Sequence, residues 1–294
     1  MTSMNMPEVE VHIDSALVRA LLQEQRPDLA ELPLVELANG WDNVVYRLGA
    51  DLTVRIPRRL AAAELVENEQ RWLPMLAERL PLPIPAPVWS GRPGCNYPWR
   101  WSLCLWLPGE TAARTPPTDV VGAARSLGGF LAALHVAAPS NAPVNPFRGV
   151  PLEQRSNRLH AAVETLREII DGPAVAALWA KLVTAPASTT AVWIHGDLHP
   201  ANILVNAGKI SGVIDFGDIT SGDHATDLAV AWMLFPAEAR LVFREAADAR
   251  DEATWARSRA WAIALSLAYL VGSADNPMMH NIGMRTLAEA LESD

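Results

Sequence analysis

The first third of the chain alternates between helical and strand-like hydrophobic patterns. Residues 14–25 and 61–80 each repeat apolar residues at a helical period, the first behind an acidic residue that can cap it. Between them, residues 44–48 and 52–56 are β-rich, and Gly49-Ala50-Asp51 separates them as a tight turn. We therefore predict a β-hairpin between two helices. Residues 80–88 carry proline at alternate positions and are predicted to be extended, and the apolar residues 99–107 are predicted to be a strand.

After Pro108-Gly109 the pattern becomes mainly helical. Helices are predicted over 119–137, within 154–182, and over 227–235, 237–249 and 254–271. A short buried strand or loop over 191–197 and a hairpin of residues 203–205 and 210–214 interrupt them. This layout predicts an α+β fold with two lobes, a small β-rich N-terminal lobe over 1–107 and a larger helical C-terminal lobe over 108–294.

Composition narrows the class of protein. Half of the 294 residues are apolar, which is enough to build a sizeable core. The 24 basic and 33 acidic residues give a net charge of −9, so binding to a nucleic-acid backbone is not expected. The longest apolar run, 261–271, is too short to cross a bilayer, and no secretory signal begins the chain. With only two cysteines, a cytoplasmic protein that does not enter the membrane is predicted.

Several aromatic and charged residues outside the catalytic motifs are predicted to have structural roles. The tryptophans of the first third are predicted to lie in the core of the N-terminal lobe; they are Trp41, Trp89, Trp99, Trp101 and Trp106. Arg58 and Arg59 are predicted to form a solvated edge. Asp218 is left with two alternatives, binding a second ion or capping a turn.

The densest group of polar residues lies between apolar strands, over 193–218. Buried polar groups in such a setting must be paired or must hold a ligand. Asp197 is followed by Asn202 and then, beyond the predicted hairpin, by Asp215. One carboxylate can orient a hydroxyl group and accept its proton, and an amide oxygen with a second carboxylate suits Mg²⁺. The hairpin returns the chain, so these three residues can converge. The pattern suggests phosphoryl transfer.

Two short motifs carry a family resemblance. His195-Gly196-Asp197 with Asn202, and Ile214-Asp215-Phe216, resemble the H-G-D-x-x-x-x-N and I-D-[FW] motifs of the aminoglycoside phosphotransferase family, relatives of the protein kinases that include choline kinase-like enzymes. The resemblance implies a two-lobed, protein-kinase-like fold. It implies that Asp197 is catalytic and that Asn202 and Asp215 bind Mg²⁺. It also implies that His195 and Asp227 support the catalytic loop.

The same resemblance extends upstream. Arg55 stands where the family usually presents a phosphate-binding lysine, and the chain has only two lysines, both far downstream. Glu69, in an E-x-x-x-L-x-x-L pattern similar to the family's helix, is the predicted ion-pair partner of Arg55. Asn43 lies at the position of the loop that covers the phosphates, and Leu105 and Leu107 match the hinge that holds the base. These residues imply that ATP or GTP is the co-substrate.

The phosphoryl acceptor stays open at this point. The family implies a small-molecule hydroxyl substrate, either an aminoglycoside or another compound such as a macrolide, choline or homoserine, and a monomer or homodimer. The string His195-x-Asp197-x-His199 leaves a metal-dependent hydrolase as a remote alternative. A nucleotide-binding pseudoenzyme is the other remote alternative, although Asp197, Asn202 and Asp215 are all present.

Overall fold

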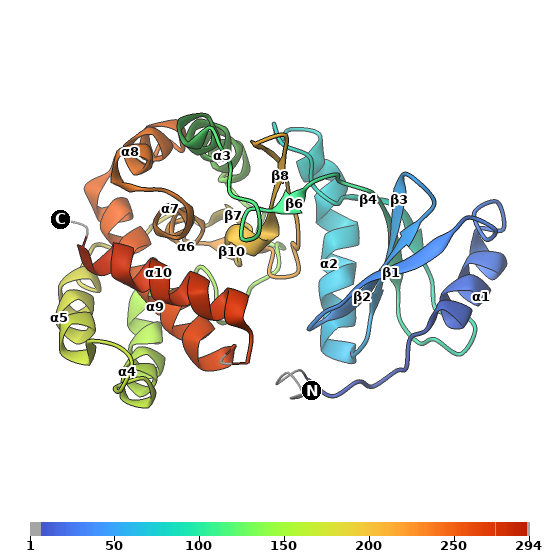
Figure 1. The fold of residues 1–294 in the computed structure, drawn as a ribbon, viewed down its shortest axis with the longest axis horizontal. Helices are drawn as coiled ribbons and strands as arrows, with labels where there is room; N and C mark the ends of the chain where they lie inside the picture. Colours follow the sequence, from blue (N-terminus) through green and yellow to red (C-terminus); the bar gives the residue numbers. More distant parts are fainter. Residues whose placement is uncertain (1–6, 274, 293–294) are drawn as a thin grey trace. The chain divides into compact units, whose positions relative to one another are not determined.

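The computed structural model describes residues 7–273 and 275–292, and the chain divides into two compact units. Of the described residues, the N-terminal unit comprises 7–79 and Pro83–Pro108, and the C-terminal unit comprises Leu80–Leu82 and those from Gly109 onwards. The N-terminal unit is built on an antiparallel sheet and the C-terminal unit is mainly helical (Figure 1). The predicted α+β fold is therefore confirmed.

The sheet of the N-terminal unit has five antiparallel strands in the order β1-β2-β3-β5-β4. They are β1 (Leu34–Asn39), β2 (Asn43–Leu48), β3 (Leu52–Pro57), β4 (Pro87–Gly91) and β5 (Trp101–Leu105). The hairpin predicted from the sequence is β2 and β3. Strand β1 was not predicted because most of its residues are exposed, so no alternation of apolar and polar residues marks it.

Two helices accompany this sheet. Helix α1 (Ser15–Gln25) begins behind Asp14, whose side chain accepts a hydrogen bond from the backbone of Leu17. Its buried face joins the hydrophobic core of β2, β3 and β5. Helix α2 (Leu60–Ala77) buries Trp72, but it also buries a charged residue, Glu69. A buried carboxylate in an apolar helix face needs a charged partner, which points to the site described below.

The turn between β1 and β2 corrects two predictions. Arg58 is buried rather than solvated, and its Nη1 donates to the carbonyl oxygen of Gly40 at 2.8 Å. Arg59 forms an ion pair with Asp42 of the same turn. Both arginines are therefore used to satisfy the polar groups of the turn. Trp41 lies in this turn and is 49% exposed, so its assignment to the core was wrong.

The C-terminal unit is organised around one long buried helix, α9 (Glu252–Gly272), which packs against most of the other helices of the unit. The other helices are α3 (Val120–Leu134), α4 (Ser156–Thr165), α5 (Gly172–Leu182), α6 (Ala225–Leu228), α7 (Val230–Leu234), α8 (Ala237–Ala246) and α10 (Pro277–Glu292). Helix α10 was not predicted. The helix expected over 227–235 is divided between α6 and α7. Among the described residues, no helix has the length and apolar character that a membrane crossing requires.

Short strands position the loops that carry the candidate residues. Strand β7 (Val192–Ile194) pairs with β10 (Thr220–Gly222), and β6 (Glu110–Thr111) pairs with β8 (Ile203–Asn206), which pairs with β9 (Lys209–Val213). The hairpin expected around Asn206-Ala207-Gly208 is β8 and β9. Residues 195–202 connect β7 to β8, with a single 3₁₀ turn at Pro200–Asn202, and Asp215 lies two residues beyond the end of β9.

Candidate active site

The loop after β7 has a fixed backbone. Gly196 has a φ of +87°, and a Cβ on it would lie 2.4 Å from the carbonyl oxygen of Asp218, so only glycine fits there. The backbone nitrogens of His195 and Gly196 donate to the two carboxylate oxygens of Asp227, at 2.8 and 2.9 Å. The conformation of the loop is therefore tied to one buried side chain at the start of the following helices.

Asp227 is completely buried and remains an anion. Its Oδ2 also lies 3.1 Å from Nε2 of His135. Burial alone would raise the pKa of Asp227, but the hydrogen bond from His135 and the backbone donor of Gly196 outweigh it, and the pKa is lowered. A buried carboxylate with three donors is a structural anchor, and this is the geometry at the position that the family resemblance assigned to loop support.

The imidazole of His195 is fully engaged within the protein. Its Nε2 lies 2.9 Å from the carbonyl oxygen of Ile214, and its Nδ1 accepts from the backbone nitrogen of Asp197 at 3.2 Å. Its ring also packs on Phe216, with the centroids 4.5 Å apart. Because both ring nitrogens are used, His195 joins the two motif segments and does not offer a metal ligand. This geometry contradicts the histidine ligation that the hydrolase alternative needs.

Asp197 presents a carboxylate that is accessible and ionised. Its side chain is 27% exposed, Oδ1 lies 2.8 Å from Nη2 of Arg148, and Oδ2 lies 3.5 Å from Nε2 of His199. Burial tends to raise the pKa of Asp197, but the charge of Arg148 and the contact with His199 lower it below the ordinary range for aspartate. An ionised, partly exposed carboxylate on a fixed loop can accept a hydrogen bond, and then a proton, from a hydroxyl group.

Arg148 was missed by the sequence analysis. It lies in the connection between α3 and α4, and besides Asp197 it contacts Asp218, whose Oδ2 is 3.3 Å from its Nε. Asp218 also accepts from Nδ2 of Asn145 at 2.8 Å. The structure thus adds an ion pair to the two alternatives given for Asp218. No pattern in the sequence marked Arg148, because the contact joins residues 49 apart through a loop without regular structure.

Asn202 and Asp215 lie close together through their backbones. The backbone nitrogen of Ile214 donates to the carbonyl oxygen of Asn202 at 2.9 Å, which sets Asp215 beside it. Nδ2 of Asn202 donates to the backbone oxygen of Asp197 at 2.9 Å, so Oδ1 is the end of the amide that can accept a cation. Asp215 is exposed and has a φ of +64°. An amide oxygen and a carboxylate are the hard oxygen ligands that Mg²⁺ prefers, so these residues fit that ion.

In the N-terminal unit, Arg55 and Glu69 form an ion pair. Nη2 of Arg55 lies 3.1 Å from Oε1 of Glu69, and the Glu69 side chain is 3% exposed. This pair joins the middle of β3 to α2 and accounts for the buried charge on that helix. The structure thus brings together the two residues that the sequence analysis proposed to pair.

The other residues predicted to bind nucleotide lie at two ends of the same sheet. Asn43 faces Pro57 across β2 and β3, whereas Leu105 faces Leu52 across β5 and β3. Leu105 is 53% exposed, and Leu107 is half-buried. The side-chain oxygen of Asn43 is buried and accepts no hydrogen bond from the described residues.

Comparison with known proteins identifies the family. The model of the phosphotransferase enzyme family matches residues 33–261, which is most of the chain, and the chain belongs to this family. The family resemblance inferred from the motifs is therefore confirmed. The chain is 30% identical over 139 residues to the aminoglycoside 3'-phosphotransferase of Escherichia coli, a match that covers 45% of this chain and 51% of that protein.

A second relative covers more of the chain. The homoserine kinase of Acidiphilium cryptum is 32% identical over 219 residues, or 68% of this chain and 65% of that protein. The chain thus spans between half and two thirds of the length of these curated relatives.

Solved structures share the fold over nearly the whole chain. The GDP complex of aminoglycoside 2'-phosphotransferase-IIIa superposes with a TM-score of 0.70 at 18% identity, covering 95% of this chain and 99% of that one. The macrolide 2'-phosphotransferase of Brachybacterium faecium has a TM-score of 0.62 at 22% identity, covering 96% and 99%. The predicted protein-kinase-like fold is confirmed.

Proposed function

We propose that this protein transfers the γ-phosphoryl group of ATP or GTP to a hydroxyl group of a small molecule. The observation that carries the proposal is the accessible, ionised carboxylate of Asp197 on a loop that also holds Asn202, with Asp215 beside it. Membership of the phosphotransferase enzyme family supports the same chemistry. Asp197 orients the acceptor hydroxyl and takes its proton as the phosphoryl group is transferred.

Each unit, taken by itself, carries residues to which we assign a nucleotide-binding role. In the N-terminal unit, Arg55, held by Glu69, contacts the phosphates, and a guanidinium can grip phosphate oxygens in two places. Asn43 contacts the phosphates, and the backbone of Leu105 and Leu107 forms hydrogen bonds with the base. In the C-terminal unit, Asn202 and Asp215 would hold Mg²⁺, which supplies charge neutralisation for the phosphates when it is bound.

The acceptor is a small hydroxyl compound, and two relatives suggest different ones. One is a kinase of aminoglycosides and the other a kinase of homoserine. Among the solved neighbours, one is a GDP complex and another is bound to ADP, so both ATP and GTP should be tested as donors. Both cysteines are free thiols, which suits the reducing cytoplasm where these nucleotides are abundant, and we place the reaction there.

Mass spectrometry of acceptor mixtures tests the proposal. The protein is incubated with Mg-ATP or Mg-GTP and aminoglycosides, macrolides, choline, homoserine and simple sugars, and a product heavier by one phosphoryl group is sought. Asp197→Asn should reduce turnover by about 10²–10⁴-fold, because the variant loses the proton acceptor but keeps the shape.

Glu238→Gln is the matched control, since Glu238 is an exposed acid on α8 and lies outside the site. Its turnover should equal that of the natural protein. Transfer that persists in Asp197→Asn at the natural rate would contradict the assignment of the catalytic base. The absence of both phosphoryl transfer and Mg-dependent nucleotide binding would refute the proposed function.

A further inference from the structure

We propose that Arg148 and Tyr269 form a subsite beside Asp197 for an anionic oxygen group of the acceptor, so that the preferred acceptor is a hydroxyl compound that carries a carboxylate. This inference rests on the proposed phosphotransferase function, and it specifies the chemical class of the acceptor.

The guanidinium of Arg148 is a built feature of the site. Its side chain is 17% exposed and donates through Nη2 to Asp197 and through Nε to Asp218. These carboxylates raise the pKa of Arg148 above its ordinary value despite the opposing effect of burial, so it is always charged. Placing a charged arginine in a largely buried position is costly, and the two carboxylates offset this cost.

The backbone on both sides of Arg148 is held rigidly. On one side, the backbone nitrogen of Asn145 donates to Oγ1 of Thr220 at 2.9 Å. On the other, the backbone nitrogen of Gly149 donates to Oγ1 of Thr226 at 3.1 Å. Gly149 has a φ of +66°, and a Cβ there would lie 2.7 Å from Cδ1 of Ile194. The loop therefore presents Arg148 in one place, as a recognition site requires.

Two hydrogen-bond donors of this cluster lack partners among the described residues. Nε and Nη2 of Arg148 are used, whereas Nη1 makes no hydrogen bond to a described residue. The Tyr269 hydroxyl is buried and is likewise without a partner in the part of the chain that the structure describes. Tyr269 packs edge-on against His199, with centroids 5.5 Å apart, and lies close enough to Asp197 for that charge to act on its pKa.

The buried Tyr269 hydroxyl and Nη1 of Arg148 can each donate to an acceptor oxygen of a bound molecule. A carboxylate supplies two such oxygens and a charge opposite to that of Arg148. An ammonium group can accept from neither donor, and Arg148 would repel it at contact. These two donors thus favour an anionic oxygen group over an ammonium group at this position.

Three acceptors of equal length test the inference. They are 4-hydroxybutyrate, its amide and 4-aminobutan-1-ol, which differ only in carrying a carboxylate, a neutral amide or an ammonium group. With the natural protein and Mg-nucleotide, we expect kcat/KM to be about 10–100-fold higher for the carboxylate than for the amide, the range that a hydrogen bond to a charged group provides. L-Homoserine and kanamycin extend the panel, and kanamycin should be the poorer acceptor.

Variants locate the preference. Arg148→Gln should bring the carboxylate-to-amide ratio towards one, and Tyr269→Phe should lower it less. Arg158→Gln, which removes an equal charge from an exposed position on α4, should leave the ratio unchanged. The ratio in the natural protein is informative even if a variant does not fold.

Hydrolysis of the nucleotide by water is compared between the natural protein and Asp197→Asn. This comparison distinguishes a failure of the phosphotransferase function from a failure of the subsite. If no Asp197-dependent hydrolysis or transfer occurs, the phosphotransferase function itself fails. If such activity occurs, three results would overturn the subsite: a faster reaction with the amino alcohol or kanamycin, an equal loss for all acceptors in Arg148→Gln, or no effect of any carboxylate on hydrolysis. An equal loss of kcat/KM for all acceptors would mean that Arg148 contacts the transferred phosphoryl group and not the acceptor.

Discussion

Oδ1 of Asp227 lies 2.9 Å from the backbone nitrogen of Gly196, a contact between residues 31 apart in the chain. It fixes a glycine that has a left-handed conformation, and the neighbouring Asp197 takes its position from that backbone. The carboxylate that we assign to catalysis is thus placed by a second, buried carboxylate. A substitution of Asp227 should therefore displace Asp197, although the two side chains are not in contact through this hydrogen bond.

Asp227→Asn should therefore affect both stability and activity. An amide offers one acceptor oxygen and turns its NH₂ group towards a backbone donor, so at least one buried N–H loses its partner. We expect a loss of about 2–3 kcal/mol in the free energy of unfolding, measured by urea denaturation, since bonds to charged groups are worth about that much. Turnover should also fall. Glu238→Gln should change neither, and an unaltered stability of Asp227→Asn would show that the anchor is not needed.

Much of this site could be predicted because its residues lie in short motifs with fixed spacing. Asp197, Asn202 and Asp215 share one strand-loop-hairpin unit, so local spacing already determines their proximity. The ion pair of Arg55 and Glu69 was predicted from the family resemblance, because both residues stand at positions similar to the family's strand and helix.

The remaining parts depend on contacts that local patterns do not encode. Arg148 reaches Asp197 from an irregular loop, and the partner could be any of several arginines in the sequence. Strand β1 is mostly exposed and has no alternation to detect. Arg58 follows Arg55 in a basic stretch that resembles a solvated edge, yet Arg58 is buried and donates to the carbonyl oxygen of Gly40. In each case a tertiary hydrogen bond decided the outcome, and hydrophobic periodicity does not report such bonds.

Glu69→Gln tests the arginine assigned to the phosphates. The variant removes the charge that holds Arg55 at 3.1 Å, so Arg55 should become less well oriented. We expect the Kd of Mg-ATP, measured by calorimetry, to rise about tenfold, which corresponds to about 1.4 kcal/mol. Glu64→Gln is the matched control because Glu64 is an exposed acid on the same helix. If both variants bind nucleotide equally well, the ion pair serves only to join β3 to α2.

Asp215→Asn tests the assigned magnesium ligand. Asparagine tolerates the left-handed φ of +64° as well as aspartate does, so the backbone should be preserved. The neutral amide binds Mg²⁺ less strongly than a carboxylate, and the concentration of Mg²⁺ needed for half-maximal nucleotide binding should rise by about tenfold or more. Nucleotide binding measured without Mg²⁺ should be unchanged. An equal Mg²⁺ requirement in both proteins would remove Asp215 from the metal site.

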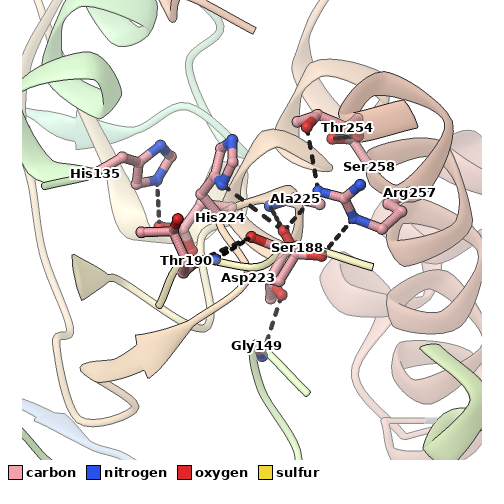
Figure 2. A network of polar contacts seen from close by, with 12 residues as sticks. His135, Gly149, Ser188, Thr190, Asp223, His224, Ala225, Thr254, Arg257 and Ser258 are labelled. Carbon is pink, nitrogen blue, oxygen red and sulfur yellow. Dashed lines mark hydrogen bonds and ion pairs between the residues drawn. The ribbon is translucent and has the colours of Figure 1, made fainter. Parts of the chain in front are cut away.

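The polar network around Asp223 predicts how stability depends on pH. Arg257 from α9 donates to both oxygens of Asp223, at 2.6 and 3.2 Å, and His224 reaches the same carboxylate at 3.7 Å (Figure 2). Burial, followed by the nearby His135, lowers the pKa of His224 below its ordinary value of 6.5, although Asp223 acts in the opposite direction. The folded protein therefore disfavours the protonated form of His224.

The sign of the effect follows from proton binding. Between the lowered pKa of His224 in the folded protein and the ordinary value of 6.5 in the unfolded chain, the unfolded chain binds more protons. The free energy of unfolding should thus decrease as the pH falls below about 6.5. Thermal unfolding at pH 7.5 and 5.5 should show a smaller decrease for His224→Gln than for the natural protein. His160→Gln, at an exposed histidine on α4, should behave like the natural protein. An identical pH dependence in all three proteins would mean that His224 does not resist protonation.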